Sequence, residues 1–151
     1  MPRIRSRAWV SATVDEVFAF FDEPRNLARL SPPPATIIVD RVEPDPPQKG
    51  SEFTFRYGIG PWMLGSWTVR LVEHVPGVRF RDETVSGPMR RFDHTHAFEP
   101  ARRRGTWVID EIDYHVGPDG LLGLVVDAAA GVAMRAIFVM RAALGRRILR
   151  A

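Results

Sequence analysis

The sequence contains no cysteine, and this absence narrows the chemistry open to the protein. Disulfide bonds, thiol catalysis and cysteine-ligated metal sites are all excluded. The first residues, Met1 to Arg5, are not followed by the apolar segment that a secretory signal requires. A cytoplasmic location is therefore the expectation.

Lysine is almost absent as well. Lys49 is the only lysine among 21 basic residues, and the formal net charge is only +3. The arginines are scattered along the chain, apart from short clusters such as Arg102 to Arg104. Because no nucleic-acid-binding motif accompanies them, we expect no nucleic-acid partner.

The chain also lacks an uninterrupted apolar run of membrane-spanning length. Leu121 to Leu144 is strongly apolar, but Asp127, Arg135 and Arg141 interrupt it. A spanning helix needs about 20 apolar residues with few or no charges. This segment therefore predicts a long amphipathic helix packed on a core, and no membrane span.

What the chain does have is a clear change of hydrophobic period. Alternation predicts a first strand over Arg3–Val10. A helix capped by Ser11 or Thr13 follows it, and a short second helix covers Asn26–Leu30. Six more strands are predicted over residues 36–42, 53–57, 66–75, 78–85, 90–99 and 106–116, and a long helix over residues 122–149.

Consecutive strands joined by short turns imply an antiparallel sheet in chain order. One face of that sheet needs cover, and only the last helix is long enough to supply it. We therefore predict an α+β fold in which seven antiparallel strands curve around the C-terminal helix and leave an internal cavity. All 151 residues are expected to form one domain.

Alternation also sorts the side chains by face. The strand at residues 90–99 has an apolar face, which is expected to point inward and carries Phe92, His94, His96 and Phe98. The polar residues that neighbouring strands add to the interior are Tyr57, Asp82, Asp110 and Tyr114. A hairpin turn near Arg102 would place Asp110 opposite His94 or His96, where a hydrogen bond satisfies both buried groups.

The histidine pair allows three interpretations. Two imidazoles on one face could bind a metal with Asp82 or Asp110, but no third histidine points inward. A His–Asp pair in a dry cavity could act as general base or acid. The third interpretation is that these residues satisfy one another and line a pocket, where they orient a ligand or only stabilise the sheet.

The segment Val78–Gly123 resembles the signature region of the SRPBCC, or START/Bet v 1-like, superfamily, and in particular its polyketide cyclase/dehydrase-like members. The matching residues are Phe80 and Asp82, Gly87-Pro88, His94, His96 and Phe98, Asp110 and Tyr114, and Pro118 to Gly123. Because Val17–Pro33 resembles the superfamily's first helical pair, the resemblance covers essentially the whole chain. It implies a helix-grip fold with a hydrophobic cavity, and it does not choose between carriers and cyclases.

The leading hypothesis is the binding of a small hydrophobic molecule, such as a lipid, quinone or polyketide, without cofactor or metal. The expected ligand-binding residues are Tyr57, Trp67, Phe80, Asp82, Phe92, His94, His96, Phe98, Asp110, Tyr114, Met134 and Phe138. Trp62 and Met63, in the apparent loop Gly58–Gly65, are a candidate lid.

Two alternatives remain open for the function. One is a cofactor-free cyclase or dehydratase that uses His94 or His96 with Asp110 for proton transfer. The other is an interaction module with a filled core. In each case the protein is expected to be a monomer or a weak homodimer.

Overall fold

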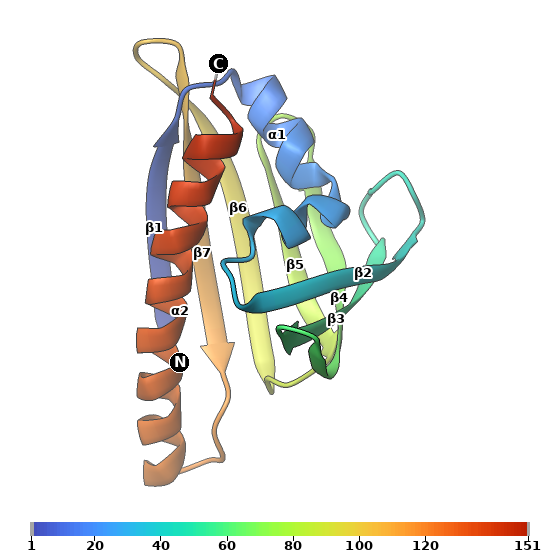
Figure 1. Cartoon of the computed structure of the whole chain (residues 1–151), viewed down its shortest axis with the longest axis vertical. Coiled ribbons are helices and arrows are strands. Elements are labelled where there is room, and N and C mark those ends of the chain that lie inside the picture. Colours follow the sequence, from blue (N-terminus) through green and yellow to red (C-terminus); the bar gives the residue numbers. More distant parts are fainter. Residues whose placement is uncertain (1, 151) are drawn as a thin grey trace.

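The computed structural model describes residues 2–150 and shows one antiparallel sheet with a long helix across it (Figure 1). The strands are β1 (Arg3–Val10), β2 (Ala35–Glu43), β3 (Glu52–Ile59), β4 (Trp62–Val75), β5 (Arg79–Ser86), β6 (Arg91–Ala101) and β7 (Gly105–His115). The helices are α1 (Val14–Asp22), the 3-10 helix η1 (Pro24–Leu30) and α2 (Leu121–Ile148). The sheet order is β1-β7-β6-β5-β4-β3-β2, so the predicted α+β architecture is confirmed.

The two short helices begin where local chemistry favours them. The Thr13 hydroxyl accepts a hydrogen bond from the Glu16 amide at 3.3 Å, and the Glu16 carboxylate accepts one from the Thr13 amide at 2.9 Å. This reciprocal capping box makes Thr13, rather than Ser11, the cap of α1. Pro24 follows the end of α1 and starts η1, because its fixed φ and missing N–H suit a first helical position.

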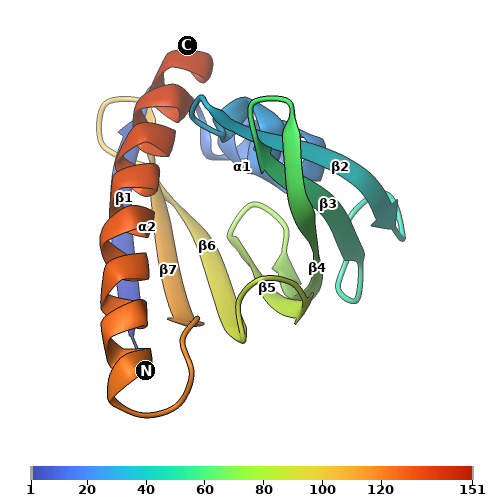
Figure 2. The same cartoon turned by 60° about the horizontal axis from the view of Figure 1, so that its bottom comes forward.

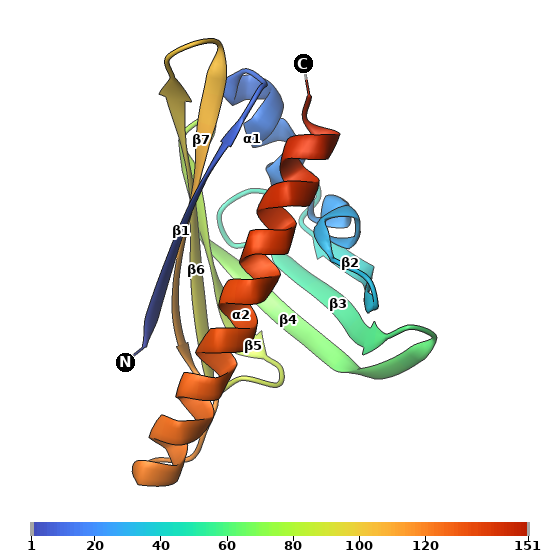
Figure 3. The ribbon, with the colours of Figure 1, turned by 60° about the vertical axis from the view of Figure 1, so that its left-hand side comes forward.

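The sheet bends because its pairing is interrupted on the β2 side. Register shifts occur between Val39 and Arg41 in β2, between Tyr57 and Gly58 in β3, and at two places between β4 and β5. Such bulges bend a strand and increase its twist. Figure 2 shows β2, β3 and β4 curling away from α2, and Figure 3 shows α2 lying across the concave side. The curvature leaves space between sheet and helix.

A buried carboxylate attaches α2 to the end of β7. Asp127, 3% exposed, accepts hydrogen bonds from the backbone N–H groups of Val116 at 2.7 Å and Gly117 at 3.0 Å. Its other oxygen lies 2.8 Å from Nδ1 of His115. The charge that interrupts the apolar segment is therefore an anchor for the helix.

The two faces of α2 differ less in polarity than the sequence suggested. Met134 and Phe138, each 6% exposed, pack on the sheet, whereas Leu121, Val132 and Val139 on the outer face are largely exposed. By length and composition alone α2 could cross a membrane, with a mean hydropathy of 1.9 over its most apolar window. In the structure α2 packs against strand β1 of the sheet and against the short helix η1.

The predicted open loop over Gly58–Gly65 is wrong. Only Gly60 and Pro61 lie between β3 and β4, and Ile59 already pairs with Trp62. Gly60 has φ +57°, which glycine tolerates at a tight hairpin turn. The sequence therefore supplies a two-residue turn, and Trp62, 71% exposed, projects from a strand end.

Candidate functional site

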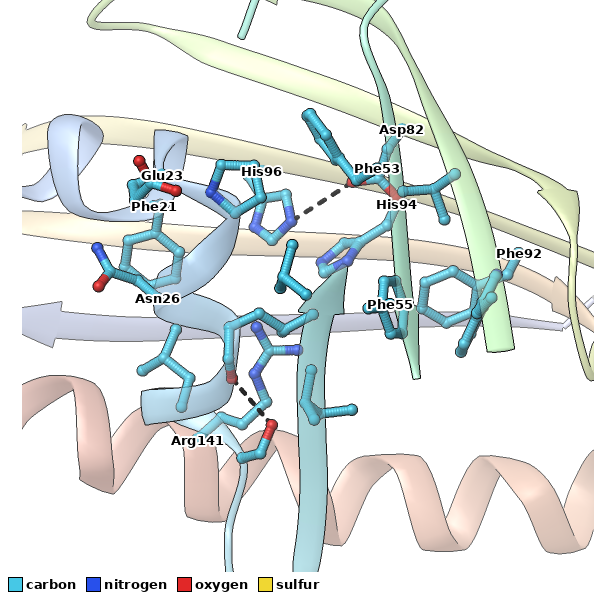
Figure 4. A pocket seen from close by; sticks show the side chains of 18 of the residues that line it. Phe21, Glu23, Asn26, Phe53, Phe55, Asp82, Phe92, His94, His96 and Arg141 are labelled. Carbon is cyan, nitrogen blue, oxygen red and sulfur yellow. Dashed lines mark hydrogen bonds and ion pairs between the residues drawn. The ribbon is translucent and has the colours of Figure 1, made fainter. Parts of the chain in front are cut away.

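A cavity of about 300 Å³ lies between the concave side of the sheet and α2. This is the lower end of the range found for small-molecule pockets. Apolar side chains from α1, η1, β2 to β6 and α2 form most of its wall (Figure 4). Its polar lining includes Asp82, His94, His96 and Arg141, together with Asp22, Glu23 and Asn26 from the α1–η1 segment.

The histidine pair sits on β6, with a carboxylate on each neighbouring strand. His96 pairs in register with Asp110 on β7, and His94 pairs with Asp82 on β5. Oδ1 of Asp110 lies 2.9 Å from Nε2 of His94 in a hydrogen bond. The same oxygen is 2.9 Å from Nδ1 of His96, but that buried nitrogen is not oriented for a hydrogen bond. The predicted pairing of Asp110 with the histidines is present.

Burial and these contacts shift the pKa values of His94, Asp82 and Asp110 in different directions. Burial, followed by the proximity of His96, lowers the pKa of His94 to about 3. Burial raises the pKa of Asp82 to about 6, against an opposing effect of His96, whose Nε2 is 3.9 Å away. Burial alone would also raise the pKa of Asp110, but the hydrogen bond from His94 and the close approach of His96 hold it well below its usual range. At neutral pH, His94 is thus a neutral ring beside an ionised Asp110.

The same side chains include a group that could ligate a metal. Asp82, His94 and His96 offer ligand atoms that all lie within 4.8 Å of one another. Two imidazoles and a carboxylate suit several divalent metals, and Asp110 would orient both rings from behind. The guanidinium of Arg141 lines the same cavity and would repel a cation there. The arrangement therefore favours a polar organic group over a metal ion.

Arg141 lies on the inner face of α2, one turn beyond Phe138. The Arg141 Cζ is 5.0 Å from the centre of the Phe138 ring. In Figure 4 Arg141 extends from α2 toward the two histidines, on the side away from Asp82. Burial lowers its pKa, and the charges of Asp110 and Asp82 oppose that effect. The cavity thus contains a cation as well as carboxylates.

Comparison with known proteins identifies the family. A family model described as polyketide cyclase / dehydrase and lipid transport matches residues 1–146. The chain belongs to this family. No curated protein matches the sequence.

Solved structures with the same fold come from several bacteria. A protein of Chromobacterium violaceum shares 19% identity at a TM-score of 0.71, over 97% of this chain and 99% of its own. A START superfamily protein of Mycobacterium smegmatis shares 10% identity at 0.71, over 97% and 96%. The di-domain ARO/CYC StfQ of the steffimycin biosynthetic pathway shares 12% identity at 0.73, over 97% of this chain and 50% of its own. At these identities the likeness shows the fold alone.

Most of the residues expected to bind a ligand line the cavity of this family member. They are Trp67, Phe80, Asp82, Phe92, His94, His96, Met134 and Phe138. Six others do not line it: Tyr57, Trp62, Met63, Phe98, Asp110 and Tyr114. Each of the six lies outside the lining of the main cavity, in a place that its neighbours or its strand explain.

Asp110 and Phe98 lie outside the main cavity, and neighbouring side chains enclose both. Asp110 lies behind the histidine rings and lines a separate small cavity of about 20 Å³. Phe98 is 4% exposed in a core cluster, where its ring lies 5.5 Å from that of Phe18. Inward orientation therefore brought both residues into the core but not to the main cavity.

The two tyrosines pack over glycines. Tyr57 covers Gly65 on β4, where a Cβ would come within 2.7 Å of the tyrosine oxygen. The Tyr114 hydroxyl donates to the backbone oxygen of Asp127 at 2.8 Å, and a Cβ at Gly131 would overlap that hydroxyl. Tyr114 is therefore a contact between sheet and α2. Trp62 and Met63 lie at the β3–β4 hairpin and are not among the lining residues.

Sequence reasoning missed the contribution of the short helices and of Arg141. Phe21, Leu27 and Leu30 form a wall of the cavity, although α1 and η1 had no assigned role. Arg141 was noted only as an interruption of an apolar run. Its spacing from Met134 and Phe138, seven and three residues, places it on the same helical face and could have identified it.

Proposed function

We propose that the protein binds a small hydrophobic molecule in the cavity between the sheet and α2. The observation that carries this proposal is the cavity itself, which is walled mainly by aromatic and aliphatic side chains. A small number of polar groups in an otherwise apolar pocket orient a ligand. Asp82, His94 and His96 supply such groups, and the family description includes lipid transport. The volume of this cavity, about 300 Å³, disfavours the alternative of an interaction module with a filled core.

A cofactor-free proton-transfer enzyme is the second candidate, and one observation favours it. Asp82 lines the cavity, and its pKa of about 6 lies close to neutral pH. General acids and bases act best when their pKa lies near the working pH. His94, with a pKa of about 3, is a weak base. In this candidate Asp82 takes the role that sequence reasoning gave to a histidine.

Fluorescence titration with the neutral dye N-phenylnaphthylamine tests the binding proposal. Val39 lines the cavity, whereas Ile38 points away from it and is 39% exposed. We expect saturable binding of one dye molecule to the wild-type protein. Val39→Trp should abolish it by filling the cavity, and Ile38→Trp, which adds the same bulk next door, should leave it unchanged. Equal binding to both variants would refute the proposal.

Native mass spectrometry of the protein purified from its own host addresses the natural ligand. A co-purified small molecule that is lost in Val39→Trp and retained in Ile38→Trp would support binding in the cavity. The same spectra report the oligomeric state, for which a monomer or weak homodimer stays a prediction. A cytoplasmic location also stays a proposal, testable by fractionation of the host.

A further inference from the structure

Arg141 has a position that the binding of a purely apolar molecule does not explain. It lines the main cavity and also the small cavity of about 20 Å³ that separates it from Asp110. It comes from the middle of the α2 packing face, where neighbours such as Met134 and Phe138 are apolar. A guanidinium here is desolvated, which is why its pKa is lowered.

The Arg141 guanidinium makes no hydrogen bond and no ion pair with any residue between positions 2 and 150. Other arginines of this chain are paired, for example Arg3 with Asp113 at 2.8 Å and Arg56 with Asp40 at 2.8 Å. Those pairs form on the exposed face of the sheet, where they contribute little to stability. Arg141 is therefore an arginine that burial desolvates and that has no protein partner among these residues.

An unpartnered, desolvated guanidinium is costly. Arginine stays protonated in proteins, so it cannot avoid the cost by losing its charge. Removing one partner from a buried charge is strongly destabilising, because the remaining charge is uncompensated. The small cavity has room for about one water molecule, which could bridge Arg141 to Asp110. Such a bridge would use only part of the five-donor guanidinium, and the rest faces the main cavity.

Neither carboxylate at this end of the cavity replaces the missing partner. Asp110 is already engaged by His94 and His96, each with a ring nitrogen at 2.9 Å. Asp82 lies beside His96 on the far side of the histidines from Arg141 (Figure 4). A planar fork of N–H donors matches a planar or tetrahedral oxyanion.

We propose that Arg141 anchors the acidic group of the bound molecule, so that the ligand is an amphiphilic anion with a carboxylate or sulfonate-like oxyanion on a hydrophobic skeleton. The proposal rests on the proposed function, because it assigns the ligand class of the same cavity. The hydrophobic skeleton fills the aromatic part of the cavity, and the oxyanion accepts hydrogen bonds from the guanidinium near His94.

A matched pair of dyes tests this assignment. Anilinonaphthalene sulfonate is N-phenylnaphthylamine with an added sulfonate, so the affinity ratio of the two dyes isolates the acidic group. A charge-assisted hydrogen bond corresponds to roughly a tenfold preference or more. We expect the wild type to prefer the anionic dye by that factor and Arg141→Met to lose the preference while still binding the neutral dye. The control is Arg135→Met, which removes an exposed arginine of the same helix and should keep the preference.

Each other outcome overturns the proposal. It fails if the wild type does not prefer the anionic dye, if Arg141→Met keeps the preference, or if that variant loses both dyes equally. The last two results would assign Arg141 to a water-bridged contact with Asp110 or to packing. If Arg141→Met does not unfold cooperatively, Arg141→Gln and competition by decanoate against decanamide in the wild type make the same comparison. Failure of the neutral dye to bind the wild type would instead refute the proposed function.

Discussion

Replacement of Asp110 by asparagine should reveal how much the carboxylate between the two histidines contributes to stability. The carboxylate accepts a hydrogen bond from Nε2 of His94 at 2.9 Å and lies equally close to Nδ1 of His96. A hydrogen bond to a charged group contributes about 1.5–3 kcal/mol, and a neutral one about 0.5–1.5 kcal/mol. Asparagine keeps the shape and one neutral acceptor. We therefore expect Asp110→Asn to lower the free energy of unfolding at pH 7 by about 2 kcal/mol.

The loss should depend on pH with a definite sign. The pKa of Asp110 is held well below its usual range in the folded protein, so its contribution is complete above the unfolded value of 3.8. It decreases as pH falls below that value, by about 1.4 kcal/mol per pH unit. Urea denaturation at pH 7 and pH 3 should show the difference between wild type and Asp110→Asn shrinking to below about 1 kcal/mol.

Asp113 provides the matched control on the same strand. It points to the other face of β7 and pairs with Arg3, whose side chain is 65% exposed. Exposed ion pairs contribute about 0–1 kcal/mol, so Asp113→Asn should change stability little. The reasoning would be refuted if Asp110→Asn cost no more than Asp113→Asn at pH 7. A cost that did not change between pH 7 and pH 3 would refute it as well.

Three further predictions follow from other contacts. The His94 ring should remain neutral at pH 5 while the Asp82 carboxyl titrates near pH 6, because burial moves the pKa of His94 to about 3 and that of Asp82 to about 6; carbon NMR of both side chains would show it, and a His94 midpoint above pH 5 would contradict it. Gly131→Ala should destabilise the protein by about 1–3 kcal/mol through overlap with the Tyr114 hydroxyl, and Tyr114→Phe should recover part of that loss in a double-mutant cycle, whereas strictly additive effects would contradict the contact. Trp62→Ser should leave N-phenylnaphthylamine affinity unchanged within about twofold, because Trp62 is exposed and does not line the cavity; a large loss would make the β3–β4 hairpin a lid after all.

The fold and the histidine pairing could be predicted because they depend on local signals. Alternation identifies the strands, and short turns leave few ways to connect them. Once the β6–β7 hairpin is centred on Arg102 to Arg104, the register brings Asp110 opposite His96 without further information. Pairing across a hairpin is thus one of the long-range contacts that a single sequence can specify.

The cavity wall could be predicted only in part, because alternation gives a residue's face and not its strand's position relative to the cavity. Tyr114 lies on β7, none of whose residues lines the main cavity, although its register partner Phe92 on β6 does. Tyr114 meets α2 at Asp127 and Gly131 rather than the cavity. The bulges that bend β2, β3 and β4 leave no clear signal in the hydrophobic period. The sequence therefore does not predict which residues of each strand line the cavity.

The polar residues of this chain also show why a histidine is an uncertain guide to function. Every one of the four histidines has a ring nitrogen within 2.9 Å of a carboxylate oxygen: His74 of Asp22, His94 and His96 of Asp110, and His115 of Asp127. The His115–Asp127 pair joins β7 to α2, and neither residue lines the cavity, which indicates that such pairing can stabilise the fold where no ligand is near. The histidine pair is therefore weaker evidence for catalysis than it is for a satisfied interior.

The group that would decide between binding and turnover is accordingly Asp82. It faces the cavity, it is not held by a close hydrogen bond, and its pKa of about 6 lets it both accept and return a proton near neutral pH. If a cyclase or dehydratase substrate is found, Asp82→Asn should abolish turnover and leave N-phenylnaphthylamine binding intact. A binding protein would instead show no turnover in the wild type and a similar ligand affinity in Asp82→Asn. Turnover that survived in Asp82→Asn and disappeared in His94→Gln would return the catalytic role to the histidine and contradict the assignment made from burial.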